Sequence, residues 1–173
     1  MSKVVELRRH TDNDGDALTL EGVDAALRLG ASARGGYELL VSSGVQRSTQ
    51  TLACFLAGLG EKVPGGLIVE RGLRSEREDR WREIYAETGK PDLPSFRAVD
   101  AEFVDAEAAS LGAAVCRVFA LLPEDGRALA VGHSPTNEAA VLALSGETVE
   151  PLAKGAGVLV VEEPRTYRVE ALD

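Results

Sequence analysis

Apolar residues follow two alternating patterns along this chain. Short runs dominated by Val, Leu and Ala are typical of strands buried in a sheet. Four of them lie at residues 3–9, 38–42, 67–70 and 128–132. Two further runs, at 158–161 and 167–170, flank a Glu-Pro-Arg-Thr turn and are predicted to pair antiparallel.

Between these runs, apolar residues recur every three or four positions, which predicts helices. The predicted helices cover residues 19–29, 46–57, 101–122 and 136–144. Thr19 is a suitable N-cap for the first. We expect Gly30 to end that helix, and Gly58 and Gly60 to end the second.

Alternating strands and helices predict an α/β fold: a three-layer α/β/α sandwich with a mostly parallel central sheet and an antiparallel edge. Residues 1–173 form one predicted domain. Residues 71–100 break the rhythm, because they combine dense charge of both signs with Gly89, Pro91 and Pro94. We expect an irregular insert there, with a short helix around 81–87, that forms a wall or lid over a site. A solvated connector without a chemical role is the alternative.

The amino-acid composition limits the kinds of binding partner that we expect. The chain has 173 residues, 45% of them hydrophobic, with a formal net charge of -9. Binding to nucleic acid or to an anionic membrane requires excess Lys and Arg, so neither partner is expected. Any anion must bind in a local pocket. Cys54 and Cys116 stand among apolar residues and are expected in the core, and the absence of a secretory leader or long apolar run predicts a cytoplasmic protein.

The chain has only two histidines, and each directly follows a predicted parallel strand. His10 follows residues 3–9 and His133 follows residues 128–132. Ligands of open α/β sheets bind beyond the carboxyl ends of the strands, so both imidazoles are expected to meet in one site. Imidazole can attack, accept and donate protons near neutral pH. Together with Arg9 and Arg47 and the free N–H groups of helix starts, they suit a dianionic phosphoryl group.

A metal site is not expected. Residues 12–16 read Asp-Asn-Asp-Gly-Asp, like the start of a calcium loop, but Ala17 and Val23 stand where that loop needs Gly and Glu. Neither histidine belongs to a His-x-x-x-His or cysteine-pair pattern suited to zinc. We therefore expect residues 12–16 to form a solvated loop at the pocket rim.

Four motifs resemble those of the histidine phosphatase superfamily, which includes cofactor-dependent phosphoglycerate mutases and small phosphohistidine phosphatases. Arg-His-Thr at residues 9–11 is similar to the family's Arg-His-Gly, and Leu-Thr-Leu-Glu-Gly at 18–22 to its Leu-Thr-x-x-Gly. Ser-Ser at 42–43 with Arg47 and Thr51 is similar to Ser-Ser-x-x-x-Arg-x-x-x-Thr, and residues 131–135 to the second histidine motif. In size and motifs the chain looks most like the small phosphohistidine phosphatases.

The resemblance implies a role for each pocket residue. His10 is the nucleophile that takes the phosphoryl group. Arg9 and Arg47 hold its oxygens, and His133 donates a further hydrogen bond. No metal or other cofactor is implied. Ser43, Asn13 and Thr11 are candidates for additional substrate contacts, although each is also an ordinary turn or cap residue.

Two departures from the family pattern matter. Thr11 replaces glycine, so either its φ stays negative or the loop is shifted. The mutase acid follows Leu-x after the third strand, but here Leu73-Arg74 is followed by Ser75, and Glu76 comes one position late. Glu78 and Asp79 are rival candidates for this acid, and all three carboxylates also fit a charged surface.

The predicted function is a metal-independent phosphatase acting through a phosphohistidine, on a phosphorylated small molecule or on phosphohistidine in a protein. A good leaving group lowers the demand for a general acid, which favours a phosphatase. Two alternatives remain: a mutase-like phosphotransferase, and an inactive phosphate-binding module.

Overall fold

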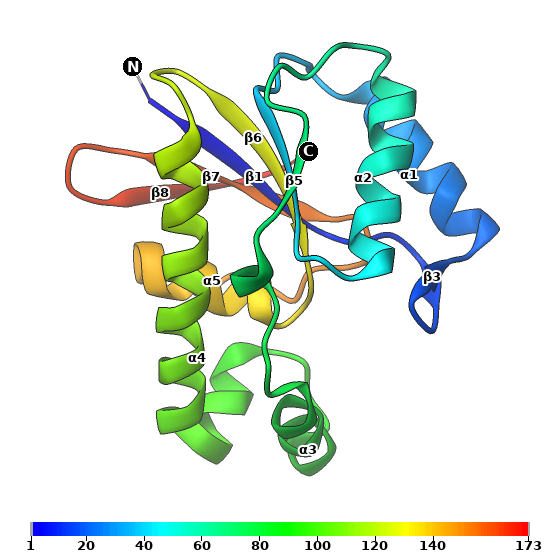
Figure 1. Cartoon of the computed structure of the whole chain (residues 1–173). Helices are drawn as coiled ribbons and strands as arrows, with labels where there is room; N and C mark the ends of the chain where they lie inside the picture. The colour runs from blue at the N-terminus through cyan, green and yellow to red at the C-terminus, as the bar shows by residue number, and fades with distance from the viewer. Residues whose placement is uncertain (1, 173) are drawn as a thin grey trace.

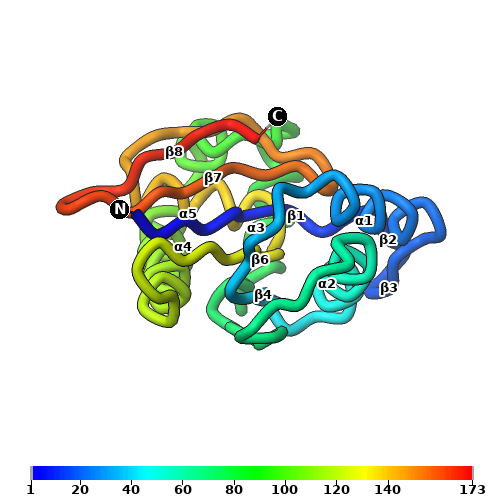
Figure 2. Tube along the Cα trace, turned by 90° about the horizontal axis from the view of Figure 1, so that it is seen from above, coloured from blue at the N-terminus to red at the C-terminus, as the bar shows by residue number. Residues whose placement is uncertain are grey.

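A central six-stranded sheet organises the molecule, and the computed structural model describes residues 2–172. Its strands are β1 (Val4–Arg9), β4 (Leu39–Ser42), β5 (Leu67–Val69), β6 (Arg127–Gly132), β7 (Gly157–Glu162) and β8 (Tyr167–Ala171). Their order is β5-β4-β6-β1-β7-β8, and Figure 2 shows the part from β4 to β8 from above. The first four are mutually parallel, whereas β7 runs antiparallel to β1 and β8 antiparallel to β7. The predicted sheet with its antiparallel edge is confirmed.

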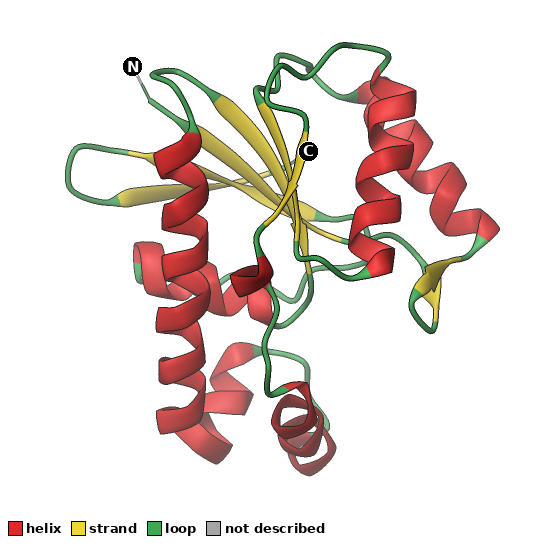
Figure 3. Cartoon of the chain, in the orientation of Figure 1, coloured by secondary structure: helices red, strands yellow, loops and turns green. Residues whose placement is uncertain are grey.

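Helices cover both faces of the sheet, as Figures 1 and 3 show. On one side lie α1 (Leu20–Ser32) and α2 (Gln46–Leu59), and on the other α4 (Leu93–Leu121) and α5 (Thr136–Ser145). Side chains of β6 alternate between the two cores: Leu129 joins the α2 side, while Ala128 and Ala130 join the α4 side. This is the predicted three-layer sandwich.

Two glycines in α1 and α2 allow the helices to pack closely and do not end them. Gly30 was expected to end its helix, but α1 continues to Ser32, and a Cβ at Gly30 would lie 2.0 Å from the Phe55 carbonyl oxygen. A Cβ at Gly58 would equally lie 2.0 Å from the Leu27 carbonyl oxygen. Both helix-end predictions were wrong because these glycines allow two helix backbones to approach closely. Gly60, with φ of 65°, does end α2.

The segment predicted as an irregular insert is mostly helical. It contains the 3₁₀ turn η1 (Arg71–Leu73), helix α3 (Glu78–Thr88) and the first turns of α4. Asp100 interrupts α4 with non-helical angles, and its Oδ1 accepts from the backbone N–H of Phe103. The helix predicted from residue 101 therefore has its own N-cap, and the sequence missed only the turns before it.

Helix α3 lies apart from the sheet and packs on α4 (Figure 1). Glu107 of α4 ties it in place, because its Oε2 accepts from Trp81 Nε1 at 3.1 Å and from the Ser75 hydroxyl. Trp81 also stacks edge-on against Phe96 and Phe103. The insert is therefore a fixed wall.

Three smaller features complete the fold. Residues 12–16, expected as a loop, form a short hairpin of β2 (Asn13–Asp14) and β3 (Ala17–Leu18). Cys54 is half-buried and Cys116 exposed, both as free thiols, so the core prediction was wrong for them: Cys116 faces solvent beside the buried stripe of α4. Within residues 2–172, no helix has the length and apolar character needed to span a bilayer.

Replacing Gly30 with alanine tests the α1–α2 contact. Helix propensity alone favours alanine by about 1 kcal/mol, but the added Cβ collides with the backbone of α2. We expect a net loss of about 1–3 kcal/mol in the free energy of unfolding, measured by urea denaturation. The matched control is Ser32→Ala on the exposed side of α1, for which a change under about 0.5 kcal/mol is expected. Stabilisation by Gly30→Ala would contradict the close contact.

Candidate active site

His10 directly follows β1, and its Nε2 carries no proton. The residue is 5% exposed, and its Nδ1 lies 2.8 Å from the Thr11 carbonyl oxygen. A carbonyl only accepts, so Nδ1 carries the proton and Nε2 keeps its lone pair. Arg47 Nε donates to that lone pair at 3.3 Å. The imidazole is thus held in the tautomer that a nucleophile requires.

His133 stands beside it at the end of β6. The two ring centroids are 5.3 Å apart. Ser43 donates its hydroxyl proton to Ser48 and accepts from His133 Nε2 at 2.9 Å, which leaves His133 Nδ1 unprotonated towards Arg47. Ser43 is therefore placed behind His133, and it is not among the residues that line the cavity.

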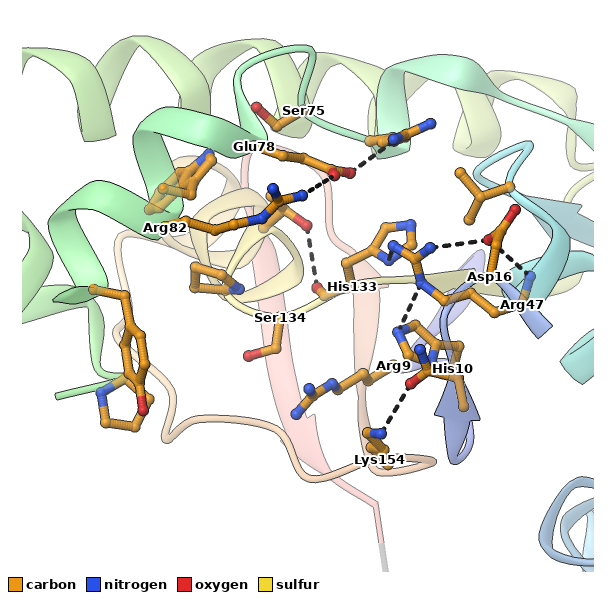
Figure 4. Close-up of a pocket in the computed structure, with 18 of the residues that line it drawn as sticks. Arg9, His10, Asp16, Arg47, Ser75, Glu78, Arg82, His133, Ser134 and Lys154 are labelled. Atoms are coloured by element: carbon orange, nitrogen blue, oxygen red, sulfur yellow. Dashed lines mark hydrogen bonds and ion pairs between the residues drawn. The ribbon is translucent and has the colours of Figure 1, made fainter. Parts of the chain in front are cut away.

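Arg47 links the two histidines at the start of α2. Its Nη2 lies 3.4 Å from His133 Nδ1, and its Nη1 donates to Asp16 Oδ1 at 2.9 Å (Figure 4). Asp16 also accepts from the backbone N–H groups of Gln46 and Arg47, so it caps α2 and orients the guanidinium together. One arginine therefore organises both imidazoles.

Arg9 enters the cavity from the opposite side. Its Nη1 donates to the Leu152 carbonyl oxygen at 2.9 Å, which leaves donors on the outer edge of the guanidinium for a ligand (Figure 4). Burial lowers the pKa of Arg9 slightly from its usual value, against the charge of Glu138. It remains a cation at neutral pH.

Thr11 and Thr51, which belong to two of the four sequence motifs, have structural roles beside the site. Thr11 donates its hydroxyl proton to the Gly22 carbonyl oxygen at 2.8 Å, and its N–H donates to Thr51 Oγ1. Thr51 in turn donates to the Arg47 carbonyl oxygen. Among the described residues only Asp125 has positive φ outside glycine, so Thr11 keeps a negative φ. It is buried as a link between β1, α1 and α2, away from the cavity.

Both imidazoles are electrically neutral in the free site. Burial lowers the pKa of His10 to about 4, helped by the charges of Arg47 and Arg9. Burial and Arg47 lower the pKa of His133 to about 3. A dianion bound between them would stabilise the imidazolium forms and raise both pKa values.

A cavity of about 900 Å³ opens from His10 towards α3. One end is lined by the two histidines with Arg9 and Arg47, while α3 and its neighbours supply an aromatic and apolar wall. That wall contains Trp81, Tyr85, Pro91, Phe96 and Pro135. Tyr85 is 51% exposed and lines the cavity, so its ring is accessible to a ligand bound there.

The structure separates the three acidic candidates. Glu76 and Asp79 are exposed and do not line the cavity, whereas Glu78 does, at the first turn of α3. Glu78 accepts from Arg74 Nε at 2.7 Å and pairs with Arg82 (Figure 4). Arg74 lowers the pKa of Glu78 below its usual value, with a smaller contribution from the charge of Arg47.

The remaining candidate contact, Asn13, lies at the cavity rim. Its Oδ1 and that of Asp12 both accept from Lys154 Nζ, at 2.8 and 2.9 Å. Over residues 2–172, no three His, Cys, Asp or Glu side chains cluster as a metal site would require. The donor set here is cationic and suits an anion.

Known structures share this architecture across their whole length. The chain is similar to a mycobacterial glucosyl-3-phosphoglycerate phosphatase, with a TM-score of 0.70 at 17% identity over 98% of this chain and 97% of that one. It is similar to the Shigella flexneri α-ribazole phosphatase, with a TM-score of 0.66 at 15% identity over 98% and 95%. The Bacillus anthracis phosphoglycerate mutase gives a TM-score of 0.66 at 15% identity over 99% and 92%.

The chain has the histidine phosphatase fold. No protein-family model matches its sequence, and no curated protein is similar to it by sequence. The fold expected from the four motifs is thereby confirmed. The roles of individual residues stay predictions, which the geometry above makes specific.

Sequence reasoning missed several residues around this cavity. Asp16 was considered only as part of a calcium-like loop, and Arg74, Arg82 and Lys154 carried no motif. The position of Asp16 just before the Leu-Thr motif could have predicted its role. The motif begins α1, and because α1 packs on α2, Asp16 lies near α2. Nothing in the sequence indicated a role for Lys154. It lies in a loop, where no helical or strand periodicity predicts which way a side chain points.

The two histidines offer a direct test by ¹H NMR, since the chain has no others. We expect both imidazole resonances to titrate below pH 5, because burial and the arginines disfavour the charged form. Adding inorganic phosphate should raise both midpoints. Because the unfolded chain has histidine pKa values near 6.5, it binds more protons between about pH 6.5 and 4, so stability falls as the pH drops through that window. Midpoints near 6.5 without phosphate would contradict the buried, arginine-flanked geometry.

Proposed function

We propose that this protein is a metal-independent phosphatase that hydrolyses phosphomonoesters through a phosphohistidine at His10. The observation that carries the proposal is the unprotonated Nε2 of His10, which accepts from Arg47, at a cavity end shared with Arg9, Arg47 and His133. A binding site alone needs no nucleophile in a fixed tautomer. The similar structures include phosphatases, which supports the same chemistry.

The reaction has two displacements. First, Nε2 attacks phosphorus, the bond from phosphorus to the ester oxygen breaks, and the leaving group departs with its electron pair. Water then attacks the phosphohistidine, which releases inorganic phosphate and restores neutral His10. Arg9, Arg47 and a protonated His133 hold the equatorial oxygens in both steps.

Glu78, rather than Glu76, is the acidic residue placed to meet the leaving group. Its pKa is lowered by Arg74, so near neutral pH it is a carboxylate with no proton to donate. An alkoxide needs a proton to leave, whereas an aryl oxide does not need one at this stage. We therefore infer a preference for substrates whose leaving group is stable without protonation.

The cavity favours a small molecule over a protein. Its volume of about 900 Å³ falls in the upper range of small-molecule sites, and the wall near Tyr85 is aromatic. A monophosphate with a planar ring fits both this wall and the leaving-group preference. Phosphohistidine in a protein is the second candidate, because its imidazole also leaves without a strong general acid.

Turnover of p-nitrophenyl phosphate and of a phosphohistidine peptide, with EDTA present, tests the function. We expect activity that survives chelation and falls at least about a thousandfold in His10→Ala, which removes the nucleophile. Arg47→Ala should lower kcat about 10²–10³-fold, as for loss of one oxyanion donor. Lys62→Ala, on the exposed surface, is the control.

Three outcomes would contradict the proposal. Release of phosphate that persists in His10→Ala would exclude the covalent step. Interconversion of phosphoglycerates would instead indicate a mutase. Phosphate binding by the wild type without any turnover would indicate a binding module.

The aromatic wall gives a separate prediction. Tyr85→Ala should lower kcat/KM for 1-naphthyl phosphate about 2–10-fold, the value of one aromatic contact. It should leave glycerol phosphate turnover and inhibition by inorganic phosphate unchanged, and Tyr85→Phe should behave as wild type. Equal losses for both substrates would show that Tyr85 does not contact the organic group.

A further inference from the structure

Behind the phosphoryl end of the cavity lies a buried acid that the proposed reaction does not use. Glu138 sits in the first turn of α5 and is 2% exposed. Its Oε1 accepts from the Leu152 N–H at 2.8 Å and from the Ser134 hydroxyl. It does not line the cavity, so it does not reach the substrate.

Two buried polar atoms here lack a partner among the described residues: Arg9 Nε, which is a donor, and Glu138 Oε2, which is an acceptor. Buried groups of this kind are costly unless they satisfy one another. Burial raises the pKa of Glu138 and lowers that of Arg9, and the charge of each residue opposes the shift of the other. The two buried side chains are therefore near enough for their charges to interact.

A second connection runs through the backbone of residue 152. Glu138 Oε1 holds the Leu152 N–H, and the Leu152 carbonyl oxygen accepts from Arg9 Nη1 at 2.9 Å. Leu152 lies in the loop between α5 and β7, where no regular ladder fixes the backbone. Glu138 thus fixes the carbonyl that in turn fixes the inner edge of the guanidinium.

We propose that Glu138 is a positioning residue for Arg9: it holds the inner edge of the guanidinium through its charge and through Leu152, so that the outer edge meets the phosphoryl oxygens. This inference rests on the phosphoryl site proposed above. An arginine side chain has many rotamers, and fixing it before binding removes an ordering cost from every substrate. Glu138 acts only through Arg9.

A double-mutant cycle tests this dependence. Binding of inorganic phosphate is measured by calorimetry for wild type, Glu138→Gln, Arg9→Ala and the double variant. Glutamine keeps the size of Glu138 but removes the charge. We expect about tenfold weaker phosphate binding in Glu138→Gln, and less than a twofold further change when Arg9 is already alanine. Glu147→Gln, an exposed acid just beyond α5, should bind as wild type.

A general structural role predicts a different result. Glu138→Gln would then weaken binding by the same factor in both backgrounds, and that additivity would overturn the proposal, as would unchanged binding in Glu138→Gln. Because the probe is phosphate itself, loss of the proposed catalysis would not affect this readout. Conversely, an active wild type with an additive cycle would leave the phosphatase standing and remove the role of Glu138.

A measurement on wild-type protein covers the case in which Glu138→Gln fails to fold. The Arg9 Nε–H resonance, assigned by its loss in Arg9→Lys, should exchange with solvent far more slowly than those of exposed arginines such as Arg28. It should also move when Glu138 titrates. Exchange at the rate of exposed arginines would contradict a fixed inner edge.

Discussion

The pairing of β1 with β6 is the constraint on which the site depends. In this register Arg9 lies opposite Gly132, and the His10 N–H donates to the Gly132 carbonyl oxygen. His10 and His133 are the next residues on neighbouring parallel strands, so they leave the sheet at one edge. Ser42 of β4 lies opposite Val131, which adds the turn that leads to Arg47. A one-residue slip in either pair would turn these side chains to other faces.

The same arrangement sets the electrostatics. A chain of net charge -9 gathers arginines around two buried imidazoles, and burial together with those arginines keeps both rings neutral in the free site. A bound phosphoryl dianion reverses that balance, since it favours protonation of His133 while the Thr11 carbonyl keeps the Nε2 lone pair of His10 available. Asp16, an acidic residue at the rim, accepts from Arg47 and so orients its guanidinium. This pairing also reduces the repulsion that its charge would exert on an anionic substrate.

Sequence predicted best what depends on local pattern. Strand runs, the Thr19 cap and the placement of both histidines follow from periodicity and from parallel-sheet geometry, and the fold they predicted was found. Prediction failed where the structural role of a residue depends on a neighbour that is distant in sequence. Gly30 carries the ordinary signal of a helix end, and only the backbone of α2 beside it shows otherwise. Glu138 is similar: an acid in the first turn of a helix is ordinary, and only the tertiary structure shows that it is buried and accepts from the Leu152 N–H.

Of Glu76, Glu78 and Asp79, only Glu78 lines the cavity, and helix α3 determines its position while Arg74 determines its ionisation. Helix α3 begins at Glu78, so Glu78 is turned towards the cavity while Glu76 stays in the preceding exposed turn. The arginine that fixes Glu78 also keeps it ionised. Placing a carboxylate by an ion pair thus removes the proton that a general acid needs. The preference we propose for leaving groups that need no proton follows from this arrangement, and the ring of Tyr85 on the same helix supports the proposal of an aromatic one.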